Sequence, residues 1–477
     1  MKINRAIIIL KTISVGIACL FLFSCGGRSV KSGMMVATEA PGNIKDQDYI
    51  NGLSWRYLTG ARIIAFNPDK PESFKVLTKD FYSACFPEIS FDGRFMLFTA
   101  QQKADNPWQI WEMELDNLKS RKIRSFSENC TDPAYLPGGR LVFSKLTVND
   151  TVRTANCLFT CNLDGSGLTQ ITFSPQTNFA TSVLKDGRLL TLCRSLMPET
   201  GTAMLTVMRP DGTKADLFYE AGKNSILLSK AKETGDGRIV FIETDEGNKQ
   251  RENVISISYN RPLHTRINIS SGIDGEFYYV MPLNPEKYLV SFRRSDSENF
   301  ALYVFDPNKK SLGQTIFSDS QYSILDVAEV KEYERPKKLP SEVDMQVKTG
   351  LLLCQNINVI NPSLPIDPGH LSKAGKIEVL GVDTTYGIVQ VEEDGSFSLK
   401  VMADTPFRIR TIDENGNVIN GPCSWLWLRP NERRGCVGCH EDPELVPENR
   451  VSIAVTKAPV IIPVHITAIK EKIVELE

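Results

Sequence analysis

The chain has 477 residues, of which 42% are hydrophobic and 23% charged, so it has enough apolar material for packed cores and is neither disordered nor collagen-like. Its 55 Lys and Arg against 57 Asp and Glu leave a formal net charge of −2, and no basic surplus favours nucleic acid as a partner. At roughly 150 residues per domain, the length predicts two or three domains.

The N-terminus has the pattern of a targeting segment. Basic residues precede an apolar run over 12–23, which is about as long as a signal-peptide core and too short to span a bilayer. The run ends at Ser24-Cys25, which resembles a bacterial lipoprotein signal, although an ordinary secretory signal with a chance cysteine is the alternative. We therefore expect residues 1–24 to be removed, Cys25 to be lipidated and 25–49 to form a tether. This predicts an outer-membrane lipoprotein of the cell envelope, on the periplasmic face or at the surface, held to the membrane by its lipid.

Residues 50–340 contain a repeat of about 48 residues. Turns ending in a basic residue recur before apolar runs, with that residue at positions 94, 140, 188, 238 and 287. A second set of apolar runs is centred at positions 63, 110, 158, 205, 254 and 302. Four of the five turns contain glycine, which suits a tight reversal into a strand, and the fifth, over 284–287, is less ideal. The period is typical of a four-stranded propeller blade. The count predicts six blades.

The first unit is incomplete. The chain enters it at Trp55, and we expect residues 324–330 to supply the missing part and close the ring. The repeats resemble those of TolB-like propellers, a resemblance that specifies fold rather than function. A large β-sandwich or two smaller β domains is the competing architecture.

The propeller segment offers no obvious catalytic set. His264 is its only histidine, and we expect it to be solvated or locally hydrogen-bonded. Trp108 and Trp111 could stack on a ligand, although strand spacing makes Trp111 a core residue. Its cysteines lie irregularly beside strand-like segments, where burial is at least as good an expectation as disulfide pairing.

The C-terminal part, residues 341–477, combines short alternating strands with one chemical motif. The strands predict a small antiparallel β-sandwich, so the whole fold is expected to be all-β. The motif is Cys436-Val437-Gly438-Cys439-His440, the pattern through which c-type haem is attached. Two thiols three positions apart can bond to the two vinyl groups of one porphyrin, and the adjacent imidazole can reach the iron. The alternatives are a Cys436–Cys439 disulfide, a redox pair without haem, or half of a zinc site, for which Cys354 and Cys423 are the nearest further cysteines.

The stretch from Asp394 through the motif to Arg450 resembles the middle domain of the hydrazine synthase alpha subunit family, which carries this domain behind a six-bladed propeller. The resemblance spans nearly all of residues 50–465. It implies one covalent haem c held by Cys436 and Cys439. The family enzyme combines nitric oxide and ammonium.

Two departures argue against transferring that activity. In the family, the catalytic haem takes its axial ligand from a tyrosine four residues beyond the motif histidine, which leaves the imidazole for a nearby zinc ion; here that position is Glu444. The family also has a further C-terminal domain with a second haem, and this sequence contains no second such motif.

The sequence therefore does not determine which residues bind the iron. His440 is the expected proximal ligand by its place in the motif. Glu444 and His370 are candidates for an axial or neighbouring position, and His465 and Met402 are weaker ones.

The sequence thus leads to an exported c-type haem protein with a redox or electron-transfer role and an unidentified redox partner. The alternative is a binding scaffold whose propeller recognises a protein or glycan, with the motif vestigial or loaded with zinc. A haem enzyme acting on small nitrogen compounds or peroxide is a third hypothesis, so whether the protein is an enzyme stays open.

Overall fold

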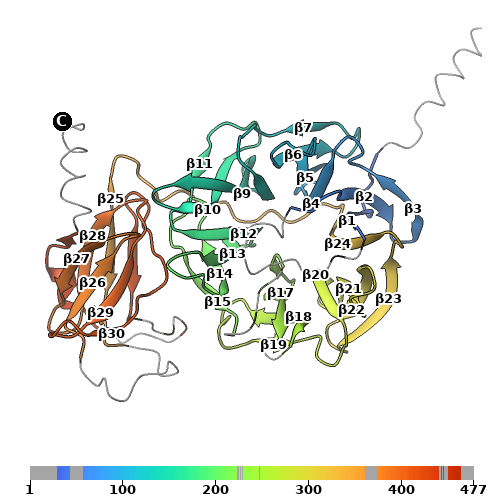
Figure 1. Cartoon of the computed structure of the whole chain (residues 1–477). Coiled ribbons are helices and arrows are strands. Elements are labelled where there is room, and N and C mark those ends of the chain that lie inside the picture. Colours follow the sequence, from blue (N-terminus) through green and yellow to red (C-terminus); the bar gives the residue numbers. More distant parts are fainter. Residues whose placement is uncertain are drawn as a thin grey trace, which may run out of the picture.

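The structure is a computed structural model in which a six-bladed β-propeller is followed by a small β-sandwich (Figure 1). It describes residues 29–42, 44, 57–222, 225, 227, 229–245, 248–359, 373–439, 442, 444 and 449–462. Within these ranges, the one helical turn is η1 (Ile453–Thr456), and no helix is long and apolar enough to cross a membrane. The predicted all-β class and the six blades are confirmed.

Each blade is a four-stranded antiparallel sheet that runs outward from the propeller axis. The innermost strands are β24 (Tyr322–Glu329), β4 (Ser83–Ile89), β8 (Cys130–Leu136), β12 (Gln176–Val183), β16 (Lys232–Glu233) and β20 (Glu276–Asn284). The second strands are β1 (Met35–Pro41), β5 (Phe95–Gln101), β9 (Arg140–Asn149), β13 (Leu189–Ser195), β17 (Arg238–Asp245) and β21 (Lys287–Arg293). The third strands are β2 (Arg62–Asn67), β6 (Gln109–Glu114), β10 (Arg153–Asn162), β14 (Ala203–Met208), β18 (Asn248–Ser258) and β22 (Ala301–Asp306). The outer strands are β3 (Lys70–Val76), β7 (Ser120–Lys122), β11 (Thr169–Gln170), β15 (Asp216–Glu220), β19 (Ile267–Asn268) and β23 (Ser311–Phe317).

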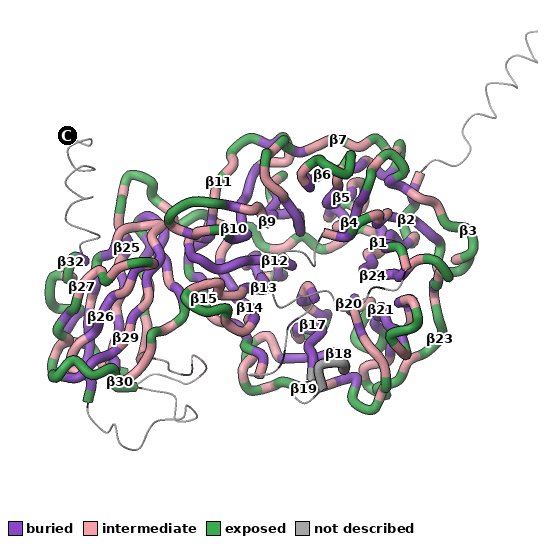
Figure 2. Tube along the Cα trace, viewed as in Figure 1, coloured by how far each residue is buried: buried purple, intermediate pink, exposed green. Residues whose placement is uncertain are grey.

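The two predicted series of strands are the second and third strands of the blades. Every turn that ends in a basic residue leads into the second strand of a blade. Every apolar run of the second set lies in a third strand. Burial is concentrated in these inner strands, which pack face to face between neighbouring blades (Figure 2). The repeat is therefore a repeat of core-forming strands, as the apolar pattern implied.

Ring closure confirms one prediction and corrects another. β24 supplies the innermost strand of the first blade, as expected for residues 324–330. The second strand of that blade is β1, which pairs with β2 on one side and β24 on the other. The expected tether over 25–49 is therefore wrong for residues 35–41, since six of these seven residues are buried in the propeller.

Hydrogen bonds near the axis link neighbouring blades. Phe86, Asp132 and Ala180 have positive φ at bulges of β4, β8 and β12, which turns their backbone groups toward the neighbouring blade. The Phe86 N–H donates to Thr38 Oγ1 at 3.1 Å, and the Ala180 N–H donates to Asp132 Oδ2 at 3.1 Å. Within the first blade, the Thr38 N–H of β1 also donates to Asp326 Oδ1 of β24 at 3.3 Å. The blades are thus linked by hydrogen bonds as well as by apolar packing.

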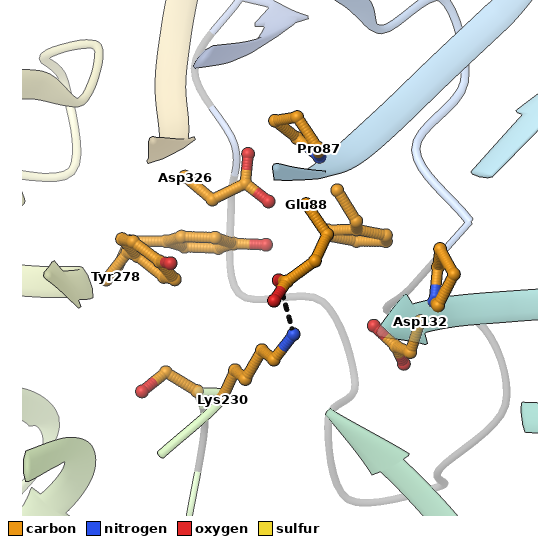
Figure 3. A pocket seen from close by; sticks show the side chains of 10 residues that line it. Pro87, Glu88, Asp132, Lys230, Tyr278 and Asp326 are labelled. Atoms are coloured by element: carbon orange, nitrogen blue, oxygen red, sulfur yellow. Dashed lines mark hydrogen bonds and ion pairs between the residues drawn. The ribbon is translucent and has the colours of Figure 1, made fainter. Parts of the chain in front are cut away.

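A small pocket lies on this axis (Figure 3). Glu88 and Lys230 meet in it at 2.7 Å, close to Asp132, Tyr278 and Asp326. Burial alone would raise the pKa of Glu88, but Lys230 and the neighbouring Lys232 outweigh that effect and hold the pKa below its usual value. The pocket has a volume of about 30 Å³, the scale of one water molecule.

The linker after β24 crosses one face of the propeller to reach the sandwich (Figure 1). The Tyr333 N–H donates to the Phe91 carbonyl at 2.9 Å, and the Lys337 N–H donates to the Lys185 carbonyl at 3.0 Å. Gly187, in one of the predicted turns, has φ +90°, and a Cβ there would lie 2.1 Å from the Lys337 carbonyl oxygen. Glycine is therefore needed at this turn both for its backbone conformation and for the passage of the linker.

The second domain is a sandwich of two four-stranded sheets. One sheet has the order β31 (Arg433–Cys436), β25 (Thr349–Cys354), β28 (Phe397–Met402) and β32 (Val460–Ile461). The other has the order β27 (Thr385–Gln390), β26 (Lys376–Leu380), β29 (Arg408–Ile412) and β30 (Val418–Asn420). The prediction of a purely antiparallel sandwich is wrong, because β31 pairs parallel with β25 and β32 pairs parallel with β28. The chain runs along the propeller before β31, and such a long connection allows a strand to enter a sheet in the parallel sense.

Candidate functional site

The cysteine motif begins at the end of the edge strand β31. The Gln355 N–H donates to the Cys436 carbonyl at 2.9 Å, and the Cys439 N–H donates to the Val359 carbonyl at 3.1 Å. Between the two cysteines, a Cβ at Gly438 would lie 2.2 Å from the Val359 carbonyl oxygen. The motif is thus held against the segment that follows β25, and only glycine fits at its third position without moving that backbone.

Both motif cysteines face a cavity of about 440 Å³. Two further cysteines line the same cavity: Cys354, at the end of β25, and Cys423, which precedes the strand-like stretch next to β29. Both were identified from the sequence as the cysteines nearest to the motif, but no sequence pattern predicts that all four thiols line one cavity. Pairing of β25 with β31 places Cys354 beside Cys436, and hydrogen bonds with Ile409 hold Cys423 against the neighbouring strand β29.

The rest of the cavity wall is largely apolar on the sandwich side, and both domains contribute charged residues to it. Its apolar residues are Leu352, Ile357, Phe397, Ile409 and Leu426. The propeller contributes residues 214–217, so the cavity lies where the two domains meet. Lys214, Arg433 and Arg434 place positive charge on this wall. A volume of this size, an apolar lining and a few polar groups are what a small-molecule or cofactor site requires, for which about 300–1,000 Å³ is usual.

Glu432 fixes the domain contact beside the cavity. Its side chain is fully buried, and its Oε1 accepts hydrogen bonds from the Lys214 N–H at 2.7 Å and from the Arg434 side chain at 2.9 Å. Its Oε2 accepts the Arg429 N–H at 2.7 Å. The Glu432 carboxylate, just before β31, therefore links the sandwich to Lys214 of the propeller, which also lines the cavity. Hydrogen bonds to both carboxylate oxygens compensate for the burial of its charge.

Burial shifts two titratable groups on the cavity wall. It raises the pKa of Asp216 above its usual value, against the opposing effects of the Leu217 N–H and Arg434. It also raises the pKa of the Cys423 thiol, whose sulfur accepts the Ile409 N–H at 3.2 Å. Cys423 is therefore a protonated thiol at neutral pH and a weak metal ligand or nucleophile.

Several residues that the sequence singled out lie outside the described residues: Cys25, His370, His440 and His465. Among the residues that the structure does describe, no group of three His, Cys, Asp or Glu is placed to hold a metal ion. Zinc binding and the iron ligands stay predictions.

Glu444 and Met402 are described, and neither lines the cavity. The Glu444 carboxylate accepts the Leu263 N–H at 2.7 Å and lies 3.5 Å from the Arg261 side chain. Met402 pairs with Thr349 at one end of β25, whereas Cys436 pairs with Cys354 at the other end. The two positions are five residues apart on β25, which corresponds to about 17 Å along the strand. The geometry thus gives no support to either residue as an iron ligand.

The propeller histidine has a role that the sequence did not indicate. His264 is solvent-exposed, as expected, with 46% of its side chain accessible, but its hydrogen bond is not local. Its Nε2 lies 2.5 Å from Asp442 Oδ2, a contact across 178 residues. Burial raises the pKa of Asp442, but the Glu444 N–H, His264 and Arg261 outweigh it and lower the pKa below its usual value. The blade that carries β18 therefore contacts Asp442, three residues beyond Cys439. No local pattern around His264 could have predicted this contact.

The remaining candidates on the propeller are structural. Trp108 and Trp111 are both buried, which confirms the core assignment of Trp111. The propeller cysteines Cys85, Cys130, Cys157, Cys161 and Cys193 are also all buried. Burial raises the thiol pKa of Cys157 and Cys161 to about 11 and that of Cys193 to about 12. These three side chains behave as small apolar residues.

Comparison with known proteins identifies similar chains. Residues 369–441 match the family model of the hydrazine synthase alpha subunit middle domain. The chain is 22% identical to hydrazine synthase subunit alpha of Kuenenia stuttgartiensis in an alignment that covers 84% of this chain and 65% of that protein. The solved Kuenenia stuttgartiensis hydrazine synthase superposes with a TM-score of 0.76 at 19% identity, covering 90% of this chain and 72% of that one. TolB from Acinetobacter baumannii aligns over 65% of this chain and 69% of its own, with a TM-score of 0.44 and 12% identity.

These matches confirm the resemblance to the hydrazine synthase alpha subunit and the fold of a propeller followed by the middle domain. The chain spans about 65% of the length of the curated relative that it matches.

Proposed function

We propose that this chain is a c-type haem protein with a redox or electron-transfer role, in which Cys436 and Cys439 hold one haem. The observation that carries the proposal is the cavity of about 440 Å³ whose wall bears both motif thiols. The next observation in its favour is the match of residues 369–441 to the hydrazine synthase alpha subunit middle domain.

The residues present fit the proposed group. The two thiols can each add across a vinyl group, the apolar wall suits a porphyrin face, and the exposed Arg433 guanidinium can pair with a propionate group. His440 is the proximal ligand implied by the motif. When bound, haem supplies a one-electron couple at its iron. The chain itself binds and orients the group and shields it from water between the two domains.

The proposal does not extend to hydrazine formation. The position that is a tyrosine in the family is Glu444 here, and its carboxylate is engaged by Leu263 and Arg261 of the propeller. A binding scaffold is the second candidate, and the axial pocket of about 30 Å³, which has the scale of one water molecule, gives it no specific support.

The test is covalent haem attachment. Expressed with a cytochrome c maturation system, the protein is expected to give a haem-staining band after denaturing electrophoresis and a c-type pyridine haemochrome spectrum. The Cys436→Ala/Cys439→Ala variant is expected to lose both signals completely, because thioether bonds are then impossible. Cys423→Ala is the matched control, since it removes a thiol of the same cavity and is expected to keep the haem.

Failure of the wild-type protein to take up haem, together with stoichiometric zinc, would support the scaffold with a zinc-loaded motif instead. A low-spin, six-coordinate spectrum unchanged by added ligands would favour electron transfer over catalysis at the iron.

We further propose that Cys25 is lipidated and anchors the protein to the outer membrane. The apolar run before Ser24-Cys25 supports this. Cells grown with labelled palmitate are expected to yield labelled wild-type protein in the membrane fraction and unlabelled protein for Cys25→Ala. Equal labelling of the two proteins would contradict the anchor.

A further inference from the structure

One thiol near the motif has no role in the proposed haem attachment. Cys354 ends β25, and Cys436 ends β31 directly beside it in the parallel register of the two strands. Registered residues of neighbouring strands lie about 4.8 Å apart at Cα, and disulfides bridge Cα separations of about 4.4–6.8 Å. The backbone spacing of this pair therefore suits a disulfide.

The side chains also have a common direction. Registered residues on paired strands point to the same face of a sheet, and both Cys354 and Cys436 line the same cavity. Cys354 is 2% exposed, and Cys436 is half-buried beside it. The cavity leaves room for either side chain to turn toward the other. Cys423 lines the cavity too, but it lies on neither strand and its sulfur accepts the Ile409 N–H.

We propose that Cys354 and Cys436 form a disulfide in the haem-free chain. Thiol–disulfide exchange with an oxidised dithiol protein or a low-mass disulfide would form it: the two cysteines lose two protons and two electrons, and the exchanging disulfide leaves as two thiols. A dithiol reductant reverses the step. The consequence of this disulfide rests on the proposed function: Cys436 is unable to add to a haem vinyl group until the disulfide is reduced.

The competing bond is Cys436–Cys439 within the motif. The two differ in what joins them: Cys354 is held beside Cys436 by a strand ladder, whereas Cys439 lies three residues further on, with its N–H bonded to the Val359 carbonyl. The ladder fixes the first pair in the folded chain. The experiment must therefore tell Cys354 and Cys439 apart as partners.

Peptide mapping does this on the full-length protein made without haem maturation. After oxidation with oxidised glutathione and alkylation, trypsin releases residues 349–373 with Cys354 and residues 435–450 with both motif cysteines. The disulfide-linked pair of peptides is expected from the wild type and from Cys439→Ala, and it is expected to be lost in Cys436→Ala and Cys354→Ser. The inference is overturned if both peptides of Cys439→Ala stay fully alkylated, or if Cys436→Ala gives as much linked product as the wild type. Cys423→Ala, the matched control, is expected to cross-link as the wild type does.

A second measurement separates this inference from the proposed function. Oxidised Cys423→Ala and wild-type apoprotein are both expected to attach haem in vitro at least tenfold more after treatment with a dithiol than before it. If the reduced protein takes up no haem, the proposed function fails while the peptide map still decides the disulfide. If the linked protein attaches haem without reduction, the control of attachment by Cys354 is wrong.

Discussion

Val36→Asp is expected to unfold the propeller, although the residue lies in a segment that resembles a tether. Val36 is fully buried in β1, which pairs with β24 on one side and β2 on the other. The substitution removes about 1.5–3 kcal/mol of apolar burial and leaves a charge with no partner, which adds about 3–5 kcal/mol. That loss is comparable to the whole stability of a typical domain, about 5–15 kcal/mol. Thermal unfolding followed by circular dichroism is expected to show loss of the cooperative transition or a large fall in its midpoint.

The matched control is Ser73→Asp, which adds the same charge at an exposed position on the outer strand of the same blade. It is expected to change the midpoint little, since exposed substitutions cost within about 0.5 kcal/mol. Equal midpoints for the two variants would show that β1 does not hold the first blade, and the ring closure would be wrong.

The propeller was predictable because a blade repeats the same physical requirements. A tight reversal leads into the second strand of each later blade, so turns that end in a basic residue mark the period in the sequence. β1 carries no such marker, because the strand inside it, β24, comes from the other end of the chain and no hairpin joins the two. Its connection to β2 is also long, so the strand lies outside the expected spacing. Local patterns therefore predicted every second strand except this one.

The site was predictable only as far as its motif. The spacing of Cys436 and Cys439 is a local property, and it alone indicated a haem site. The neighbours of the motif come from pairing and docking: Cys354 through the register of β25 with β31, Lys214 through the contact between domains, and Asp442 through its approach to His264. Such contacts join residues between about 80 and 220 positions apart, and no periodicity in a single sequence specifies them.

The joint between the domains rests on two tryptophans of the strand-like stretch that follows Cys423. Trp427 is 3% exposed and packs among propeller side chains, including Leu136, Val142 and Met208. Trp425 instead donates its Nε1–H to the Met197 carbonyl at 2.8 Å. The first holds the joint by apolar burial and the second by a directed hydrogen bond.

Trp427→Ala is therefore expected to cost about 3–5 kcal/mol and to loosen the sandwich from the propeller. In calorimetry, the single unfolding transition of the two domains is expected to separate into two transitions. The linker over 331–348 is expected to become sensitive to proteases. Haem loading should fall as well, because residues 214–217 of the propeller form one wall of the cavity.

Phenylalanine at the same two positions supplies the control. The Trp427 Nε1–H has no hydrogen-bond partner, so Trp427→Phe gives up little and is expected to remain close to wild type. Trp425→Phe leaves the Met197 carbonyl without its donor, and a loss of about 1–3 kcal/mol is expected. If both alanine and phenylalanine at position 427 destabilise the protein equally, the joint depends on the indole itself rather than on apolar burial, and the docking account fails. If neither does, the two domains are held together instead by hydrogen bonds of Glu432 to the Lys214 N–H and of the Arg429 side chain to the Asp211 carbonyl.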